Sequence, residues 1–226
     1  MYLKHFNLNS YPFTTAPDPE FYYPTPKHRE ALACLVYAVH QRKSFALITG
    51  EVGAGKTMLC RAALARFGEN VDAAIINHTL LTPKQFIQAV CARFELNTEG
   101  LTKFELLQQL ESYLVKRTRR GRQQVLIIDE AQDLSADVLE EIRLLGNLET
   151  ENEKLLEIIL VGQPELREMI ARQELRQLEQ RLALKFHLAP LSRSETADYI
   201  DHRLEVAGAG ERTVFSPEAK REVHRA

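Results

Sequence analysis

The sequence lacks long apolar runs, a recognisable leader and paired-cysteine motifs. Its uninterrupted apolar stretches span only a few residues, so we expect no membrane span within these 226 residues. The N-terminal MYLKHFNLNSYPF has no apolar stretch ahead of a small-residue cleavage site, so we expect no secretory signal. The three cysteines, Cys34, Cys60 and Cys91, show no C-x-x-C spacing. Their odd number favours reduced, buried thiols in the cytoplasm, with Cys60 as a packing residue.

The chain also lacks a strong excess of charge of either sign. Its formal net charge is −2, so no overall electrostatic field favours nucleic acid or anionic lipid. The one dense basic segment is KRTRRGR at residues 116–122, which contains Arg117, Arg119, Arg120 and Arg122. We interpret it as a solvated helix C-terminus, where cations complement the helix dipole. The alternative is a loop that contacts nucleic-acid phosphates, but no aromatic residues are interspersed to stack on bases.

Short apolar segments alternate with helical patterns over most of the chain. A composition of 45% hydrophobic and 27% charged residues is typical of a globular protein. Five segments are predicted to be buried strands: 45–49, 73–77, 125–129, 155–162 and 183–188. Helices are predicted at 27–42, 57–67, 83–94, 104–117, 138–149 and 164–182. This alternation indicates an α/β fold with a parallel sheet that is covered by helices on both faces.

Both ends of the chain differ from this central pattern, which covers residues 27–190. Residues 1–26 hold five of the nine prolines and seven of the seventeen Phe and Tyr residues. We therefore expect an irregular segment that lies in a groove rather than a regular helix. Residues 191–226 begin with a capping box at Ser192 and Glu195, which starts a helix. Because so short a helical stretch cannot bury its own apolar faces, we interpret it as the start of an incomplete helical domain.

The segment GEVGAGKT, residues 50–57, matches the G-x-x-x-x-G-K-[ST] pattern of a phosphate-binding loop. It lies between a predicted strand and a predicted helix, so its backbone N–H groups and the helix dipole would surround a phosphate. Lys56 would reach the β and γ phosphates of ATP, and the Thr57 hydroxyl would bind Mg²⁺. The predicted nucleotide-binding residues are Gly50, Glu51, Val52, Gly53, Ala54, Gly55, Lys56, Thr57 and Met58.

A second motif, VLIIDEAQ, predicts hydrolysis in addition to binding. It places Asp129 and Glu130 at the end of a buried strand, where side chains emerge at the carboxyl edge of a parallel sheet. Asp129 would bind Mg²⁺ together with Thr57, and Glu130 would act as the general base toward the attacking water. Alternatively, the acidic pair only caps the next helix. Its occurrence together with the phosphate-binding loop favours the catalytic interpretation.

Other polar positions near strand ends are candidate catalytic residues. Asn77 ends the second strand, where it would hydrogen-bond Glu130 and hold the carboxylate away from water. Gln163 follows the fourth strand and would contact the γ-phosphate or the water. The alternative for both is an ordinary turn residue. Arg181, in preference to Arg176, would point from the end of its helix into a neighbouring subunit's site, the alternative being a solvated arginine.

Five segments together resemble the ExeA/GspA-type AAA+ ATPases of bacterial general-secretion and pilus-biogenesis loci. They are PFTTAPDPEFYYPTPKHREAL, LITGEVGAGKTMLCRAAL, VLIIDEAQDLS, LLEIILVGQPELREMI and LAPLSRSETADYIDHRL, in the family's order. The resemblance implies a P-loop AAA+ (ASCE) fold, a three-layer α/β domain with parallel strand order 5-1-4-3-2 and then an α-helical lid. It also implies that the aromatic N-terminal segment lies near the adenine. Gln163 would then be a first sensor, and Arg181 a finger that acts between subunits.

The resemblance further implies partners other than ATP and ADP. Family members are cytoplasmic modules, often followed by a membrane span, that help build an outer-membrane secretin. We therefore expect a cytoplasmic module of a longer protein, and we expect the full-length protein to form a homo-oligomer that is anchored in the inner membrane and contacts a secretion complex. The chain ends before the family's second sensor arginine, so we interpret it as an ATPase module with a truncated lid. One alternative is the AAA+ ATPases of transposition and replication initiation, whose DNA binding would use residues 116–122. A scaffold that binds ATP without turnover is disfavoured by Glu130.

Overall fold

The computed structural model describes residues 2–14, 18–151, 153–210 and 212–225. The chain divides into two compact units, one made of residues 30–188 and the other of residues 1–29 together with 189–226. Residues 1–26 and 191–226 were predicted to be separate segments, whereas in the structure both belong to one unit. These two predicted segments also include positions 1, 15–17, 211 and 226, which lie outside the described residues.

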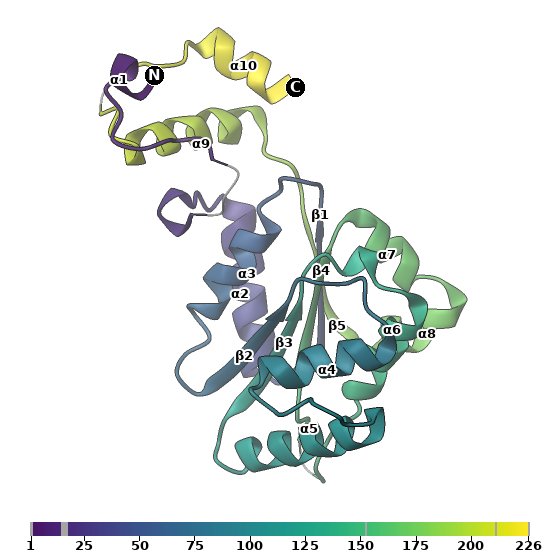
Figure 1. Cartoon of the computed structure of the whole chain (residues 1–226). Helices are drawn as coiled ribbons and strands as arrows, with labels where there is room; N and C mark the ends of the chain where they lie inside the picture. The colour runs from purple at the N-terminus through teal and green to yellow at the C-terminus, as the bar shows by residue number, and fades with distance from the viewer. Residues whose placement is uncertain (1, 15–17, 152, 211, 226) are drawn as a thin grey trace. The chain divides into compact units, whose positions relative to one another are not determined.

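A five-stranded parallel sheet forms the centre of the unit 30–188 (Figure 1). Its strands are β1 (Phe45–Gly50), β2 (Val71–Ile76), β3 (Gln123–Ile128), β4 (Glu157–Gly162) and β5 (Leu182–Leu188). They are arranged in the order β2-β3-β4-β1-β5, so the predicted order 5-1-4-3-2 is confirmed. Every neighbouring pair is parallel, and all five strands therefore end at the same edge of the sheet.

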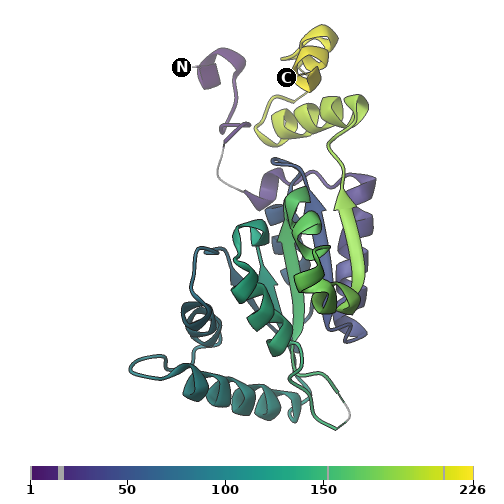
Figure 2. The same ribbon diagram turned by 90° about the vertical axis from the view of Figure 1, so that its right-hand side faces the viewer.

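Helices cover both faces of this sheet, as the view turned by 90° shows (Figure 2). On one face lie α2 (Pro26–His40) and α3 (Lys56–Leu64). On the other lie α4 (Pro83–Arg93), α5 (Lys103–Thr118), α6 (Ala136–Leu145), α7 (Pro164–Ile170) and α8 (Arg176–Arg181). The predicted three-layer arrangement is thus confirmed.

The strand residues alternate between two hydrophobic clusters, one on each face. In β1, Phe45 and Leu47 belong to the cluster under α4, α5 and α6, while Ala46 and Ile48 belong to the cluster under α2 and α3. Successive side chains of a strand point to opposite faces, so a strand with two buried faces must be apolar throughout. This is why the strands were recognisable as short apolar runs.

The segment 164–182 was predicted as one helix, which is wrong. The structure has α7, then a 3₁₀ turn η3 (Gln173–Leu175), and then α8. Ile170 and Leu175 are both buried in the same cluster. Five residues along a continuous α-helix would place their side chains about 140° apart around the axis. The break at Arg172, which has an extended backbone, allows both side chains to face the core.

The second unit joins the two ends of the chain. It contains α1 (Tyr2–Phe6), the 3₁₀ turn η1 (Pro19–Phe21), α9 (Arg193–Val206) and α10 (Pro217–Arg225). Its core packs Leu8 and Phe21 against Ile200 and Leu204 of α9. The expectation of no regular helix before residue 26 is wrong for α1, since the first proline occurs only at Pro12. The N-terminal segment therefore supplies the apolar partner that α9 needs.

Two expectations from composition can be compared with the described residues. Cys60 is buried, and burial strongly raises its pKa, so its predicted packing role is confirmed. Cys91 is also buried, which raises its pKa to about 11. Within the part of the chain that the structure describes, no helix combines the length and apolar character needed to cross a membrane.

Candidate nucleotide site

The phosphate-binding loop connects the carboxyl end of β1 to the first turn of α3. Gly53 and Gly55 have φ angles of 79° and 81°, in the left-handed region that residues with a Cβ rarely adopt. Gly55 is the N-cap of α3, so the backbone turns sharply just before the helix begins. This conformation directs the N-terminus of α3 toward the loop, where an anion would meet the positive end of the helix dipole.

Lys56, the first residue of α3, is held against the loop. Its ammonium group donates hydrogen bonds to the carbonyl oxygens of Gly50, at 2.8 Å, and Glu51, at 3.0 Å. The side chain is buried, whereas Glu51 and Val52 are exposed. Among the described residues the partners of this buried ammonium are carbonyl oxygens, so it is available to a phosphate, which forms a stronger, charge-assisted hydrogen bond.

Thr57 and Asp129 meet across two segments of the chain. The Thr57 hydroxyl donates to Oδ2 of Asp129 at 2.8 Å, although the residues are 72 positions apart. Asp129 follows β3 directly and is buried, and its backbone N–H donates to the carbonyl of Ile76 at 2.9 Å. A hydroxyl and a carboxylate are the hard oxygen ligands that Mg²⁺ takes alongside nucleotide phosphates, so this pair fits the ion.

Glu130 occupies a strained turn directly after Asp129. Its φ of 54° and ψ of 38° lie in the left-handed region, which is uncommon for a residue other than glycine. Its N–H donates to Oδ1 of Asp129 at 3.0 Å, and its carbonyl accepts from the N–H of Asp133 at 3.1 Å. Such strain persists only where surrounding contacts fix it and is concentrated at functional sites.

Gln132 is a contact residue that the sequence analysis missed. Its side-chain Nε2 donates to Oε2 of Glu130 at 2.9 Å, and its Oε1 accepts from the backbone N–H of Gln163, also at 2.9 Å. One amide therefore links the acidic pair after β3 to the segment after β4. The residue stood inside the VLIIDEAQ motif, and its polar character next to an acidic pair was the only signal available.

The two polar residues predicted at strand ends have different surroundings. Gln163 is the N-cap of α7 and makes no capping bond with its own side chain. Asn77 directly follows β2 and is exposed. Among the described residues, the hydrogen bond to the Glu130 carboxylate comes from Gln132, two positions away on the same turn, and none comes from Asn77. The predicted Asn77–Glu130 bond is thus not formed.

Arg181 lies far from the phosphate-binding loop of its own chain. It precedes β5, whose first residue, Leu182, pairs with Phe45 at the amino end of β1. The loop follows the other end of this six-residue strand, about 20 Å away at the usual rise per residue. The Arg181 guanidinium donates to the carbonyl of Arg143 at the end of α6, at 3.3 Å. Arg176 is exposed on α8.

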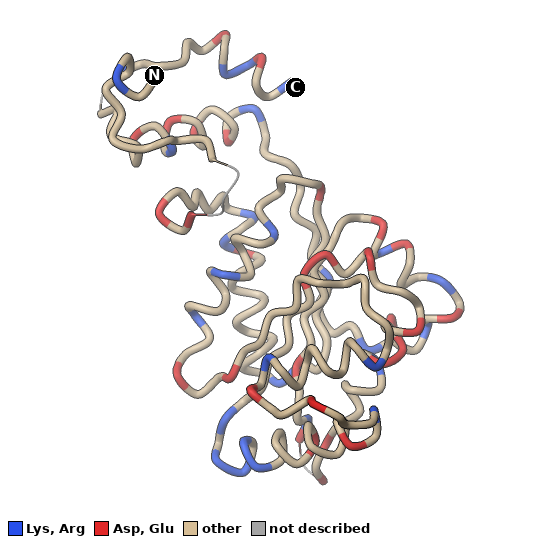
Figure 3. The backbone as a smooth tube through the Cα atoms, viewed as in Figure 1, with Lys and Arg blue, Asp and Glu red and all other residues tan. Residues whose placement is uncertain are grey.

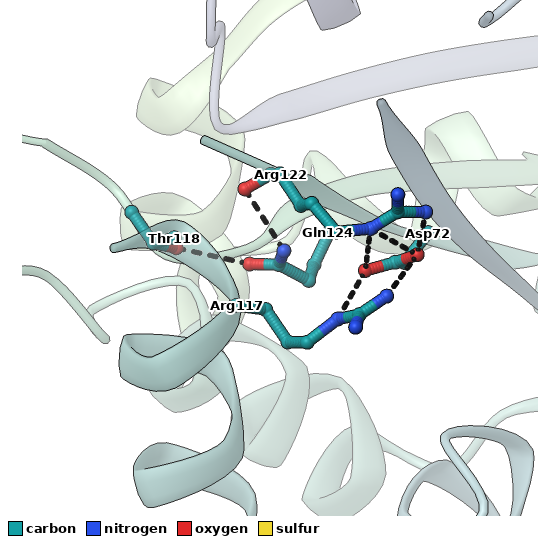
Figure 4. A network of polar contacts seen from close by, with 5 residues as sticks. All are labelled: Asp72, Arg117, Thr118, Arg122 and Gln124. Atoms are coloured by element: carbon teal, nitrogen blue, oxygen red, sulfur yellow. Dashed lines mark hydrogen bonds and ion pairs between the residues drawn. The ribbon is translucent and has the colours of Figure 1, made fainter. Parts of the chain in front are cut away.

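The basic segment 116–122 lies at the end of α5 and in the turn that follows (Figure 3). Two of its arginines converge on Asp72 of β2 (Figure 4). Arg117 donates from Nε and Nη2 to the two carboxylate oxygens at 2.7 Å each, and Arg122 donates through Nε at 2.8 and 2.9 Å. Arg119 and Arg120 are exposed. The prediction of a solvated helix end therefore holds for only part of the segment.

The Asp72 cluster predicts a pH-dependent contribution to stability. Burial alone would raise the pKa of Asp72, but the hydrogen bonds from Arg122 and Arg117 outweigh it and lower the pKa to about 2. A carboxyl group whose pKa is lower in the folded state stabilises the fold at pH values above its pKa in the unfolded state. This stabilisation is lost as the pH falls through the folded-state pKa. Asp72→Asn should therefore reduce the free energy of unfolding by about 1–2 kcal/mol at pH 7, allowing for solvent screening.

Urea unfolding of both proteins between pH 7 and pH 2 measures this contribution. The difference between wild type and variant should shrink as pH falls from about 4 to about 2, across the interval between the unfolded and folded pKa values. The control is Glu99→Gln, which removes an exposed carboxylate in a loop. A difference that stays constant down to pH 2 would contradict the ion-pair interpretation.

Comparison with known proteins agrees with the geometry of the site. Residues 39–170 match the protein family described as "AAA domain". The chain is 39% identical over 226 residues to "General secretion pathway protein A" of Aeromonas hydrophila, a match that covers 100% of this chain and 41% of that protein. The chain thus spans less than half the length of this curated relative.

Two solved structures share the fold. Cdc6p from Pyrobaculum aerophilum has a TM-score of 0.69 at 17% identity and covers 92% of this chain and 58% of that one. The ORC2 protein of Aeropyrum pernix, solved as ADPNP–ADP complexes, has a TM-score of 0.68 at 18% identity and covers 88% and 58%. At such low identity, these likenesses concern the fold alone.

The family match extends over more than half of the chain, and it includes the phosphate-binding loop and the acidic pair. The identity to the Aeromonas protein confirms the resemblance to the ExeA/GspA type that the five sequence segments indicated. The chain therefore belongs to the AAA domain family and is a P-loop ATPase related to general secretion pathway protein A.

Proposed function

We propose that the chain hydrolyses ATP in a Mg²⁺-dependent reaction at the carboxyl edge of its sheet. The observation that carries this proposal is the 2.8 Å contact between the Thr57 hydroxyl and the Asp129 carboxylate, which unites the phosphate-binding loop with the end of β3. Lys56 lies in the same loop and supplies the cation. The proposed nucleotide-binding residues remain those of the loop, residues 50–58.

Each polar group at this edge has a proposed task. Lys56 binds the β and γ phosphates, and Thr57 and Asp129 hold the Mg²⁺ ion. When bound, Mg²⁺ neutralises charge that develops on the phosphates. Glu130 accepts a proton from the water that attacks the γ-phosphorus, so the products are ADP and inorganic phosphate.

Gln163 and Asn77 are proposed to assist this reaction. Gln163 follows β4 at the same edge as the loop, a position from which its side chain can reach the γ-phosphate or the water. Its amide is not engaged in capping α7, which supports a role toward a ligand. Asn77 directly follows β2, the strand next to β3, so we retain it as a polar residue on the same edge of the sheet as the acidic pair.

We also propose that this ATPase drives assembly or transport in a bacterial secretion complex, on the cytoplasmic side of the inner membrane. The support is the 39% identity to general secretion pathway protein A over the whole chain. DNA binding is the weaker alternative. Asp72 engages two of the four arginines in the basic segment, which leaves fewer cations for phosphate contacts.

Replacement of the loop lysine tests the proposed activity. Lys56→Ala should weaken Mg²⁺–ATP binding about 100-fold, or about 3 kcal/mol, because a charge-assisted contact to the phosphates is lost. Binding is measured with a fluorescent ATP analogue, and turnover by phosphate release. Lys43→Ala is the matched control, since Lys43 is exposed and precedes β1 at the opposite edge of the sheet.

The same assays distinguish the proposed ATPase of a secretion complex from the DNA-binding alternative. Equal binding by Lys56→Ala and Lys43→Ala would refute the assignment of the loop as the nucleotide site. Turnover in the absence of Mg²⁺ would refute the metal dependence. Addition of duplex DNA should leave the rate unchanged, and a salt-sensitive stimulation that is lost in Arg119→Gln/Arg120→Gln would favour the DNA-binding alternative.

A further inference from the structure

Gln132 holds the Glu130 carboxylate with one end of its amide and the start of α7 with the other. The Nε2–Oε2 distance to Glu130 and the Oε1–N distance to Gln163 are both 2.9 Å, so both contacts are well-formed hydrogen bonds. The amide orientation is fixed by these partners, because a carboxylate only accepts and a backbone N–H only donates. The side chain thus bridges two segments that both lie at the catalytic edge.

The surrounding structure leaves little freedom for this bridge. A Cβ at position 162 would lie 2.7 Å from Oε1 of Gln132 and 3.3 Å from its backbone N, so only glycine permits this approach. Ala131 and Leu166, which flank the bridge on η2 (Ala131–Asp133) and α7, are fully buried in one hydrophobic cluster. Movement of the β4–α7 junction would therefore move Gln132 and, through it, the carboxylate of Glu130.

We propose that Gln132 is a positioning residue that couples the general base to the β4–α7 junction, an inference that rests on the proposed function. The hydrogen bond from Nε2 holds the Glu130 carboxylate in one orientation toward the water. A displacement of Gln163 loosens the hydrogen bond between Gln132 and Glu130. A contact between the γ-phosphate and the β4–α7 junction thereby changes the position of the Glu130 carboxylate. The coupling needs no contact between Gln132 and the nucleotide.

Gln132→Glu separates positioning from simple support of the fold. The new carboxylate still accepts from the Gln163 N–H, but it cannot donate to Glu130 and places a second negative charge beside it. We expect kcat at pH 7 to fall about tenfold with KM for ATP unchanged. Single-turnover phosphate release measures kcat and equilibrium binding of a fluorescent ATP analogue measures affinity, so the loss should appear in the first measurement and not in the second.

Two further variants complete the experiment on the 226-residue chain. Gln108→Glu adds the same charge at an exposed position of α5 and should leave kcat unchanged. Gln132→Met removes both hydrogen bonds at similar volume and should lower kcat at all pH values. If Gln132→Glu keeps the wild-type kcat, or if it loses ATP binding together with kcat, Gln132 only supports the fold and the proposal is wrong.

A measurement that does not depend on ATP binding distinguishes failure of this inference from failure of the proposed function. The side-chain amide resonance of Gln132, assigned by its disappearance in Gln132→Met, should shift in Glu130→Ala. An absence of ATP hydrolysis in the wild type would refute the proposed function. An amide resonance that does not respond to Glu130→Ala would refute the coupling, whatever the hydrolysis rate.

Discussion

Glu130→Gln should bind ATP as the wild type does and hydrolyse it about 10² to 10⁴ times more slowly. The amide cannot accept the proton of the attacking water, so the chemical step loses its general base. Its carbonyl oxygen can still accept the hydrogen bond from Gln132, so the left-handed turn after β3 should remain intact. The loss should therefore appear in kcat and not in the dissociation constant for ATP.

Single-turnover phosphate release and equilibrium binding of a fluorescent ATP analogue measure these two quantities. Glu168→Gln is the matched control, because Glu168 is an exposed carboxylate on α7 and its removal changes the net charge equally. If Glu130→Gln retains more than about a tenth of the wild-type rate, a loss below that expected for a general base, another group takes the proton.

Arg181→Ala should give an even larger loss, about 10³ to 10⁵ in rate, in an assembled form of the protein. Arg181 lies at the opposite edge of the sheet from its own phosphate-binding loop, so it cannot reach a nucleotide bound there. We propose that it enters the site of a neighbouring chain and stabilises the charge on the transferring phosphoryl group. ATP binding by the variant should be normal because its loop is unchanged.

Mixing two inactive variants tests the proposed action between chains. Arg181→Ala keeps an intact loop, and Lys56→Ala keeps an intact arginine, so mixed assemblies should recover part of the activity. Light scattering establishes that the variants associate, and Arg176→Ala controls for the loss of a nearby exposed arginine. Co-assembly without any recovery would show that Arg181 is not donated to a neighbour.

The strands were predictable because the sheet is buried on both faces. The central strands β1, β3 and β4 each contain a continuous apolar run, whereas the edge strand β5 alternates between half-buried and exposed residues. The strand order followed from the resemblance to a known family. The break between α7 and α8 was not predictable in the same way, since neither proline nor glycine marks it. It arises because Ile170 and Leu175 must reach the same cluster, a requirement that only the tertiary structure imposes.

The phosphate-binding loop and the acidic pair were predictable because their residues are close in sequence. Their meeting, through Thr57 and Asp129, followed from placing both at the carboxyl edge of one sheet. The bridge through Gln132 was not predictable, because it depends on a turn geometry and on a close approach at Gly162. A polar residue in a motif does not by itself show which of several neighbours it contacts.

The basic segment illustrates the same limit for charge. Its density in the sequence gave no sign that Asp72, which lies 45 residues before Arg117, takes two of its arginines. Short-range patterns report how a helix is solvated, whereas ion pairs between a helix end and a strand depend on how the two pack. The count of cations therefore overstated the charge that is available to a partner.

The packing of residues 1–29 against residues 189–226 has a consequence for the order of folding. Leu8 and Phe21 are synthesised well before their partners Ile200 and Leu204, because the whole sheet unit lies between them in the sequence. If the intervening chain were unfolded, closing so long a loop would cost about 4–5 kcal/mol of conformational entropy. The sheet unit 30–188 holds its core within itself, so it should form first and shorten that loop. Hydrogen exchange during refolding of the 226-residue chain should then show that the unit of residues 1–29 and 189–226 gains protection after the sheet unit.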